Sequence, residues 1–204
     1  MPRAFAEIAF TPSVVAAQER YGSRWANHGF TLAAEAGNRL GAAESAFIAE
    51  RDSFYQATVS QDGWPYVQHR GGPPGFLRVL DPGTLAYADF RGNRQYLSVG
   101  NLNADDRLTL ILVDYANQRR LKIWGRARLV HADQDAALLA RLALPGYSAR
   151  VERGVVIAVA AFDWNCPQHI TPRYTLAEVE ALASPLVEEN RRLKARLADL
   201  AAPG

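Results

Sequence analysis

The feature that most constrains this chain is a period-two pattern between Phe54 and Arg70, in the segment FYQATVSQDGWPYVQHR. Aromatic and β-branched residues alternate there with polar ones, as they do on strands that have one buried face. Asp62 and Gly63 interrupt the pattern with a dipeptide that is typical of hairpin turns. The segment therefore predicts a β-hairpin.

Similar short runs, separated by turn residues, follow this hairpin. We expect strands over 76–81, 84–90, 107–115, 119–131 and 151–165, and helices over 93–103 and 133–146. The first three or four strands are expected in meander order, and the last, largely apolar run is expected to be central or buried on both faces. Because the strands alternate mainly with turns, the pattern favours an antiparallel barrel of six to seven strands over a wound parallel sheet. The fold class is mainly β with flanking helices.

Both ends of the chain are predicted to be helical. One helix is expected from Thr11 or Ser13 to Gly29 and another over 41–52, so we divide the chain into an N-terminal helical extension (1–52), a barrel domain (53–172) and a C-terminal helical tail (173–204). The tail is expected to break at Ser184-Pro185. Its apolar seam has a spacing of four, three, four and three residues, at Leu186, Asn190, Leu193, Leu197 and Leu200. This seam either packs on its own domain or contacts a second helix across a dimer.

Composition excludes several classes of function. With 23 basic and 21 acidic residues, the overall charge gives no reason to expect nucleic acid or membrane binding. The longest apolar run, 155–162, is too short to cross a bilayer, and a single cysteine is consistent with a cytoplasmic protein. The four histidines are scattered, so no metal site is expected.

Candidate ligand-binding residues gather between Trp64 and Asn101, in a stretch with four arginines, six glycines and few acids. Arg70 follows a strand and precedes two glycines, while Arg91, Asn93 and Arg94 form a second donor set before a helix that Asn93 can cap. Arginine side chains and the amides of a helix N-terminus both bind anions. The two clusters predict a phosphate site, the alternative being solvated arginines beside glycine turns.

Other catalytic motifs are weak or absent. Cys166 lies three residues before His169, and such a pair becomes a nucleophile only if the two side chains meet in the fold. The G-x-S-x-G, P-loop and dinucleotide-binding patterns are absent at the expected strand-to-helix junctions. Hydrolase and nucleotidase functions therefore have little support.

Several segments between about Phe54 and Val130 carry a resemblance to a known family. They are the opening hairpin, the stretch RGGPPGFLRVLD, the segment ADFRGNRQYLSVGNL and the paired strands LTLILVDY and RRLKIWGRARLV. Together they resemble the pyridoxamine phosphate oxidase-like proteins, whose fold is an FMN-binding split β-barrel. In order and spacing the chain is most similar to a less characterised bacterial branch of that family.

The resemblance implies a homodimer that binds FMN in a groove between its subunits. It also implies a small-molecule electron donor or acceptor, such as NAD(P)H. It does not identify a catalytic residue in this chain. The flavin-lining residues would be Gln68, His69, Arg70 and Gly71; the phosphate and ribityl corner would comprise Asp89, Phe90, Arg91, Asn93, Arg94 and Gln95; Trp164 and His169 would approach the ring.

The chain departs from the pyridoxamine phosphate oxidases proper at two places. They carry an R-x-V-L-L-K strand and an Arg-Leu-x-Pro tail, whereas this chain has YVQHRGG and LADLAAPG. We therefore expect an FMN-dependent oxidoreductase with a substrate other than pyridoxamine phosphate. The alternatives are a non-catalytic flavin-binding or sensing module and a split barrel that binds deazaflavin or haem.

Overall fold

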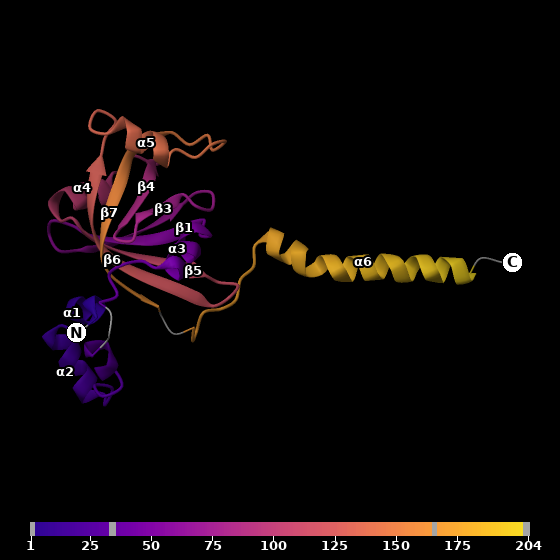
Figure 1. Ribbon diagram of the computed structural model, residues 1–204, viewed down its shortest axis with the longest axis horizontal. Coiled ribbons are helices and arrows are strands. Elements are labelled where there is room, and N and C mark those ends of the chain that lie inside the picture. The colour runs from indigo at the N-terminus through magenta and orange to yellow at the C-terminus, as the bar shows by residue number, and fades with distance from the viewer. Residues whose placement is uncertain (1–2, 33–35, 165–166, 202–204) are drawn as a thin grey trace.

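Seven antiparallel strands form one curled sheet at the centre of the molecule (Figure 1). The computed structural model describes residues 3–32, 36–164 and 167–201. The strands are β1 (Ser53–Val59), β2 (Pro65–Gly71), β3 (Leu77–Asp81), β4 (Thr84–Phe90), β5 (Arg107–Asp114), β6 (Arg119–Val130) and β7 (Val151–Trp164). Their order in the sheet is β2-β1-β5-β6-β7-β4-β3. The predicted class, mainly β with a split barrel of six to seven strands, is confirmed.

The strand order corrects the expected meander. β1 and β2 form the predicted hairpin, but β3 pairs only with β4 and lies at the opposite edge of the sheet from β2. The chain crosses between these edges through the glycine-proline loop 72–76, where Pro73 and Pro74 lack the backbone N–H that would continue a ladder. The hairpin loop has five residues, 60–64, and is longer than the favoured two. The Ser60 amide donates to the Trp64 carbonyl across it, and Gly63 adopts a φ of 86°.

The two long strands β6 and β7 form the centre of the barrel, as the apolar character of β7 predicts. At the bulge between Trp124 and Gly125 they approach so closely that a Cβ on Gly125 would lie 2.5 Å from Ile157 Cγ2. Only glycine fits such an approach without displacement of the neighbouring strand. The core itself is filled by Phe54, Phe76, Tyr87, Leu110, Leu121, Ile123 and Ile157, all almost fully buried.

Side chains connect the two edge regions of the open barrel. Phe54 of β1 stacks on Phe76, which precedes β3, with ring centroids 5.3 Å apart. The hydroxyl of Tyr87 on β4 donates a buried hydrogen bond of 2.6 Å to Gln56 Oε1 on β1. Arg70 of β2 forms an ion pair with Asp89 of β4. These contacts bring β2, the first strand of the sheet order, and β4, the sixth, together at one end of the barrel.

Helices cover the ends of this sheet and extend from it. They are α1 (Ala4–Ala9), α2 (Pro12–Arg20), the 3-10 helix η1 (His28–Thr31), α3 (Ala42–Ala49), α4 (Leu97–Ala104), α5 (Ala136–Leu142) and α6 (Leu176–Ala201). α3 supplies Phe47 and Ile48 to the barrel core. None of the described helices is long and apolar enough to span a membrane.

Two helix predictions are wrong in their extent. The helix expected to continue to Gly29 ends at Arg20, because Gly22 adopts a φ of 71°, the left-handed conformation that commonly terminates a helix. The expected break at Ser184-Pro185 is absent, and α6 continues through Pro185. Figure 1 shows α6 extending away from the barrel.

Candidate functional site

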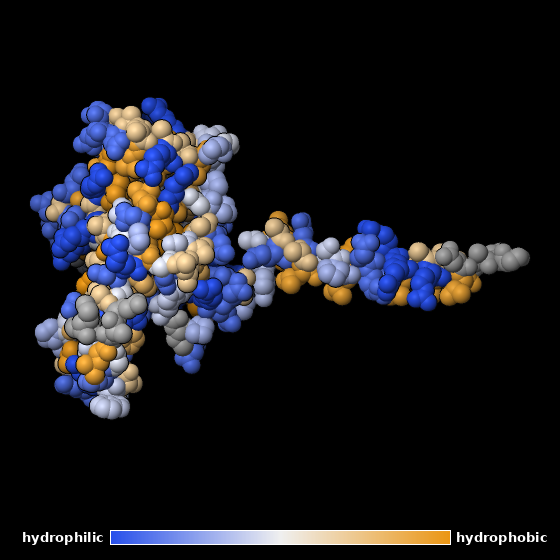
Figure 2. All heavy atoms as spheres, in the orientation of Figure 1, coloured by the Kyte–Doolittle hydropathy of each residue, from blue (hydrophilic) through white to orange (hydrophobic). Residues whose placement is uncertain are grey.

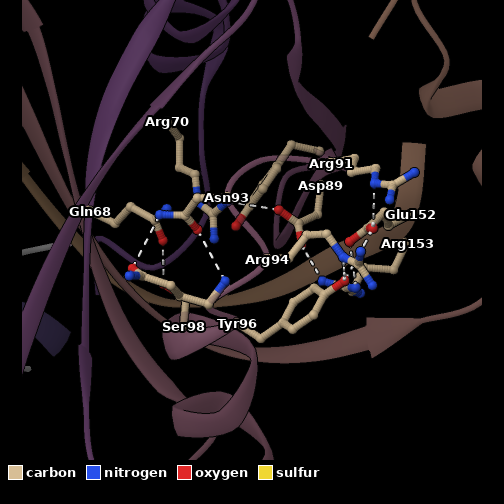
Figure 3. Close-up of polar contacts among 12 residues, drawn as sticks. Gln68, Arg70, Asp89, Arg91, Asn93, Arg94, Tyr96, Ser98, Glu152 and Arg153 are labelled. Carbon is tan, nitrogen blue, oxygen red and sulfur yellow. Dashed lines mark hydrogen bonds and ion pairs between the residues drawn. The ribbon is translucent and has the colours of Figure 1, made fainter. Parts of the chain in front are cut away.

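A pocket of about 200 Å³ lies where β2, the end of β4, the loop 91–96, the first turn of α4 and the start of β7 meet. Its polar contacts are drawn in Figure 3. The lining residues are Tyr66, Gln68, Arg70, Asp89, Phe90, Gly92, Asn93, Arg94, Gln95, Tyr96, Leu97, Ser98, Val99, Glu152 and Arg153. Three arginines therefore face two carboxylates in one small pocket.

Asp89 holds two of these arginines. Its Oδ1 accepts a hydrogen bond of 2.7 Å from Arg70 Nη1, and its Oδ2 accepts one of 2.7 Å from Arg153 Nη1. Asp89 is 4% exposed and Arg153 is 8% exposed, so this cluster is shielded from water. The Nε atoms of Arg70 and Arg153 are buried and have no hydrogen-bond partner among the described residues. Buried charges are normally paired and fully hydrogen-bonded. The two Nε donors depart from this rule and can donate to a ligand.

Glu152 forms the second acidic contact of the pocket. Its carboxylate lies 2.9 Å from Arg153 Nη2 and 4.0 Å from Arg91 Nε, and it accepts a hydrogen bond of 3.3 Å from the Tyr96 hydroxyl. The guanidinium of Arg153 lies over the Tyr96 ring at 5.1 Å. Glu152 thus fixes the wall of the pocket that β7 contributes.

Arg94 differs from the other arginines of the lining. Within the described part of the chain, no carboxylate lies within 4.0 Å of its guanidinium; its Nε contacts the Tyr96 hydroxyl at 3.5 Å. Arg94 and Tyr96 have φ values of 63° and 55°, a left-handed backbone that costs non-glycine residues of order 1–3 kcal/mol each. Strain of this kind concentrates at functional loops, and here it places at the pocket a cation that has no direct acidic partner among the described residues.

The N-terminus of α4 opens onto the same pocket. The expectation that Asn93 caps this helix is wrong. Its Oδ1 accepts from the Gln95 amide at 3.1 Å, and α4 begins only at Leu97 after the left-handed Tyr96. No side chain of the described residues caps the first turn. The uncapped N–H groups of residues 97–99 therefore add positive potential to the pocket.

Hydrogen bonds attach α4 to the barrel. Ser98, 2% exposed, donates through Oγ to Gln68 Oε1 at 2.9 Å, and Asn101 Nδ2 donates to Thr58 Oγ1 at 3.0 Å. These contacts fix the helix terminus relative to β1 and β2. The pocket is therefore held by the sheet on one side and by an anchored helix on the other.

This arrangement can bind an anion. It combines one cation without an acidic partner, two buried guanidinium groups with spare N–H donors and an uncapped helix N-terminus. Phosphate oxygens accept several such charge-assisted hydrogen bonds at once. No group of three or more potential metal ligands occurs in the described ranges.

The structure brings most of the expected residues together. Gln68, Arg70, Asp89, Phe90, Asn93, Arg94 and Gln95 line one pocket, and Arg91 lies beside it through its contact with Glu152. His69 and Gly71 do not line it, because successive residues of a strand face opposite sides of the sheet. The His69 ring instead packs edge-on against Tyr55 at 5.6 Å.

Trp164 and His169 are not at this pocket either. Trp164 ends β7, whereas Glu152 and Arg153 lie at the beginning of that strand. The Trp164 indole donates to Glu44 Oε1 at 2.8 Å and packs against Phe47. His169 is exposed in a turn with a φ of 65°. Cys166, proposed to pair with His169, lies outside the described residues.

Sequence reasoning missed five polar residues of the pocket: Tyr66, Tyr96, Ser98, Glu152 and Arg153. The period-two pattern that contains Gln68 and Arg70 was sufficient to place Tyr66 on their face. Glu152 and Arg153 are distant in sequence, but a charged pair at the start of an otherwise apolar strand is itself a signal. Nothing in the local sequence distinguished Ser98.

The family model for pyridoxamine 5'-phosphate oxidase matches residues 40–164. None of the curated proteins matches the chain. Similar solved structures include HupZ from Group A Streptococcus, which is 14% identical and is aligned over 66% of this chain and 100% of HupZ with a TM-score of 0.46. An FMN-binding protein from Syntrophomonas wolfei is 13% identical over 76% of this chain and 95% of its own, with a TM-score of 0.44. Because the family model covers more than half of its length, the chain belongs to the pyridoxamine 5'-phosphate oxidase family.

Proposed function

We propose that the protein is an FMN-dependent oxidoreductase and that the pocket binds the phosphate end of FMN. The observation that carries the proposal is Arg94, a pocket arginine with no carboxylate within 4.0 Å among the described residues. Asp89 and Glu152 compensate Arg70, Arg91 and Arg153 only in part. A phosphate dianion supplies the missing negative charge and accepts the free donors.

The size of the pocket supports a site completed by a second subunit. Pockets that enclose a whole small molecule usually measure about 300–1,000 Å³, whereas this one measures about 200 Å³. The outer face of β2, β1 and β5 exposes Val67 (59%), Tyr55 (42%) and Ile111 (37%) on paired strands. An exposed apolar sheet face next to a half-formed site favours a homodimer interface, and we propose one here.

When bound, FMN supplies the hydride chemistry. The residues of this protein would hold and orient FMN. Arg94, Asn93 and the first amides of α4 would bind its phosphate, and Gln68 and Tyr66 would contact its ribityl group. Arg70 and Arg153, which Asp89 fixes in place, provide positive potential rather than proton transfer.

One observation favours a second candidate, a flavin-binding module without catalysis. Among the described residues, the pocket lining contains no histidine, the side chain that most often transfers protons near neutral pH. His69 is on the opposite face of β2. An oxidoreductase with this site would take its protons from solvent or from a carboxyl or tyrosine side chain of the lining.

A binding titration tests the proposal. Purified protein, stripped of any bound flavin, is titrated with FMN while flavin fluorescence is recorded, alongside the Arg94→Ala variant. Arg126→Ala serves as the matched control, because Arg126 pairs with Asp106 on the surface away from this pocket. We expect Arg94→Ala to weaken binding more than about tenfold, or 1.4 kcal/mol, and Arg126→Ala to leave it unchanged. Absence of FMN binding by the unmodified protein would contradict the proposal.

A second measurement separates the enzyme from the module. The FMN-loaded protein is mixed anaerobically with NADH or NADPH, and the oxidised flavin absorbance is followed. Bleaching faster than that of free FMN under the same conditions supports an oxidoreductase. Absorbance that persists with these and other donors supports the binding module.

A further inference from the structure

The helix α6 carries a continuous apolar stripe that the rest of the described chain leaves uncovered. It extends 26 residues from the barrel, and Leu186, Leu197 and Leu200 are 73%, 65% and 81% exposed. Figure 2 shows apolar side chains gathered along one side of this helix and charged ones elsewhere on it. Helices in proteins gain most of their stability from packing of an apolar face, so this uncovered stripe indicates a packing partner.

The stripe follows a heptad repeat over nearly the whole helix. One set of core positions is Leu176, Ala183, Asn190 and Leu197, and the other is Val179, Leu186, Leu193 and Leu200. In heptad notation these are the a and d positions. Pro185 falls at an outer c position, so its ring lies off the seam, although its missing N–H removes one backbone hydrogen bond of the helix. The repeat is therefore longer than the two heptads that the sequence reading recognised.

We propose that α6 forms a parallel, in-register, two-stranded coiled coil with α6 of a second copy of this chain. In that arrangement a g position faces the e position of the next heptad on the other helix. Glu189 at g then faces Lys194 at e, and Leu182 at g faces Val187 at e. Charge meets opposite charge and apolar meets apolar, while Asn190 meets its own copy at an a position. A single buried asparagine of this kind fixes register and a two-stranded state.

The antiparallel alternative fits the same residues less well. Its e positions match, with Glu180 facing Lys194 and Val187 facing its own copy, but its core and g positions do not. With the two helices fully overlapped, Leu186 would face Asn190, and the g positions would face one another. Glu189 would then lie against its own copy, and Leu182 against Arg196. Like charges and an unpaired core amide both disfavour that arrangement. In a single helix Glu189 pairs with Arg192 at 2.6 Å, an exposed contact of the kind that contributes little.

The coil is independent of flavin binding but compatible with the proposed homodimer. A parallel coiled coil has its two-fold axis along the bundle, so both barrels emerge from the same end of it. A cyclic dimer of barrels has the same symmetry. The coil would add a second contact between the subunits, beyond the sheet face described above.

Site-specific disulfide formation in the full chain tests both partner and orientation. Cys166 is first replaced by serine, and then Leu197→Cys at a core position is compared with Glu188→Cys at the outer f position. Facing a positions of a parallel pair lie within the Cα separation that a disulfide allows. In a buffer of oxidised and reduced glutathione, we expect Leu197→Cys to form a covalent dimer on non-reducing gels and Glu188→Cys to remain largely monomeric.

Each other outcome of this experiment overturns the proposal. In the antiparallel pair Leu197 lies opposite Val179, far from its own copy, so Leu197→Cys would fail to cross-link. A helix that packs on its own barrel or on another protein would fail in the same way. Equal cross-linking of both variants would show collision without a defined interface.

A charge exchange provides a second test. In the Leu197→Cys background, Glu189→Lys places like charges at both g-to-e contacts and is expected to weaken association about fivefold. Adding Lys194→Glu restores the opposite charges and should restore cross-linking. Equal cross-linking in all three proteins, or loss that the double exchange does not reverse, would contradict the parallel register.

Discussion

The guanidinium of Arg70 and the carboxylate of Asp89 lie 2.7 Å apart and join two strands that are far apart in the sheet order. β2 is at one edge of the sheet and β4 is next to the other edge. Asp89 also holds Arg153 of β7 at 2.7 Å. One buried carboxylate therefore both closes the barrel at this end and fixes two cations at the wall of the pocket.

The first prediction concerns this carboxylate. Asp89→Asn removes the charge that compensates Arg70 and Arg153, two largely buried cations, and should lower the free energy of unfolding by about 3–5 kcal/mol. Urea denaturation measures the loss. Asp106→Asn is the control, because its carboxylate pairs with Arg126 in an exposed position and should cost less than about 1 kcal/mol. Equal losses in both variants would show that the buried ion pairs stabilise the fold no more than the exposed pair does.

The second prediction separates strain from binding at position 94. The φ of 63° at Arg94 suits glycine, so Arg94→Gly should be more stable than Arg94→Ala, by about 1 kcal/mol, in the absence of ligand. Both variants lose the guanidinium, so both should bind FMN more than about tenfold more weakly than the unmodified protein. Denaturation midpoints and binding titrations on the same samples provide the comparison. If Arg94→Gly bound FMN normally, the side chain would have no part in binding.

The third prediction concerns the buried hydrogen bond between β4 and β1. Burial raises the pKa of Tyr87, whose hydroxyl therefore stays protonated and donates to Gln56 at 2.6 Å. Gln56 Nε2 already lacks a partner among the described residues, so Tyr87→Phe would leave the amide unpaired at both ends. We expect a loss of about 1–3 kcal/mol. Tyr147→Phe, at a half-exposed position, should change stability by less than about 0.5 kcal/mol, and a similarly small change for Tyr87→Phe would refute the argument.

The fourth prediction is a pH dependence near the end of β7. Partial burial raises the pKa of Glu44, but hydrogen bonds from Trp164 and the Gly41 amide outweigh it, and the pKa lies below its usual value of 4.5. The unfolded chain therefore binds more protons as the pH falls through 4.5 and below, and the stability from this contact is lost in that range. Above it, the contribution is fully present.

The variant Trp164→Phe removes the indole donor to Glu44. Its stability should differ most from that of the unmodified protein near pH 6, and the difference should shrink as the pH is lowered toward 3. Urea midpoints at a series of pH values measure this convergence. A difference that stays constant across the series would mean that packing of the indole, and not its hydrogen bond, accounts for the loss.

Local patterns in the sequence predicted the strands, because period two, turn dipeptides and β-branched residues act over a few positions. The order of the strands was not predictable in this way. β3 follows β2 closely in the chain yet pairs at the far edge, a result of long-range packing such as the stack of Phe54 on Phe76. The tail is a separate case, because Pro185 predicted a break by a local rule and α6 nevertheless continues through it.

The candidate site was predictable to the extent that it is local. Asn93 and Arg94 could be predicted as one group because they are consecutive residues of the same loop. His69 lies outside this pocket, because neighbouring residues of a strand alternate between the two faces of the sheet. Arg153 was missed because only the pairing of β7 with β4 brings it to Asp89.

The central claim is that the pocket recognises the phosphate of FMN through Arg94. Calorimetric titration of the unmodified protein and of Arg94→Ala, each with FMN and with riboflavin, tests it most directly, because the two ligands differ only in the phosphate. We predict that the unmodified protein binds FMN more than about tenfold more tightly than riboflavin, and that Arg94→Ala loses most of this preference. Equal affinity of the unmodified protein for the two ligands, or a preference that Arg94→Ala retains in full, would contradict the account.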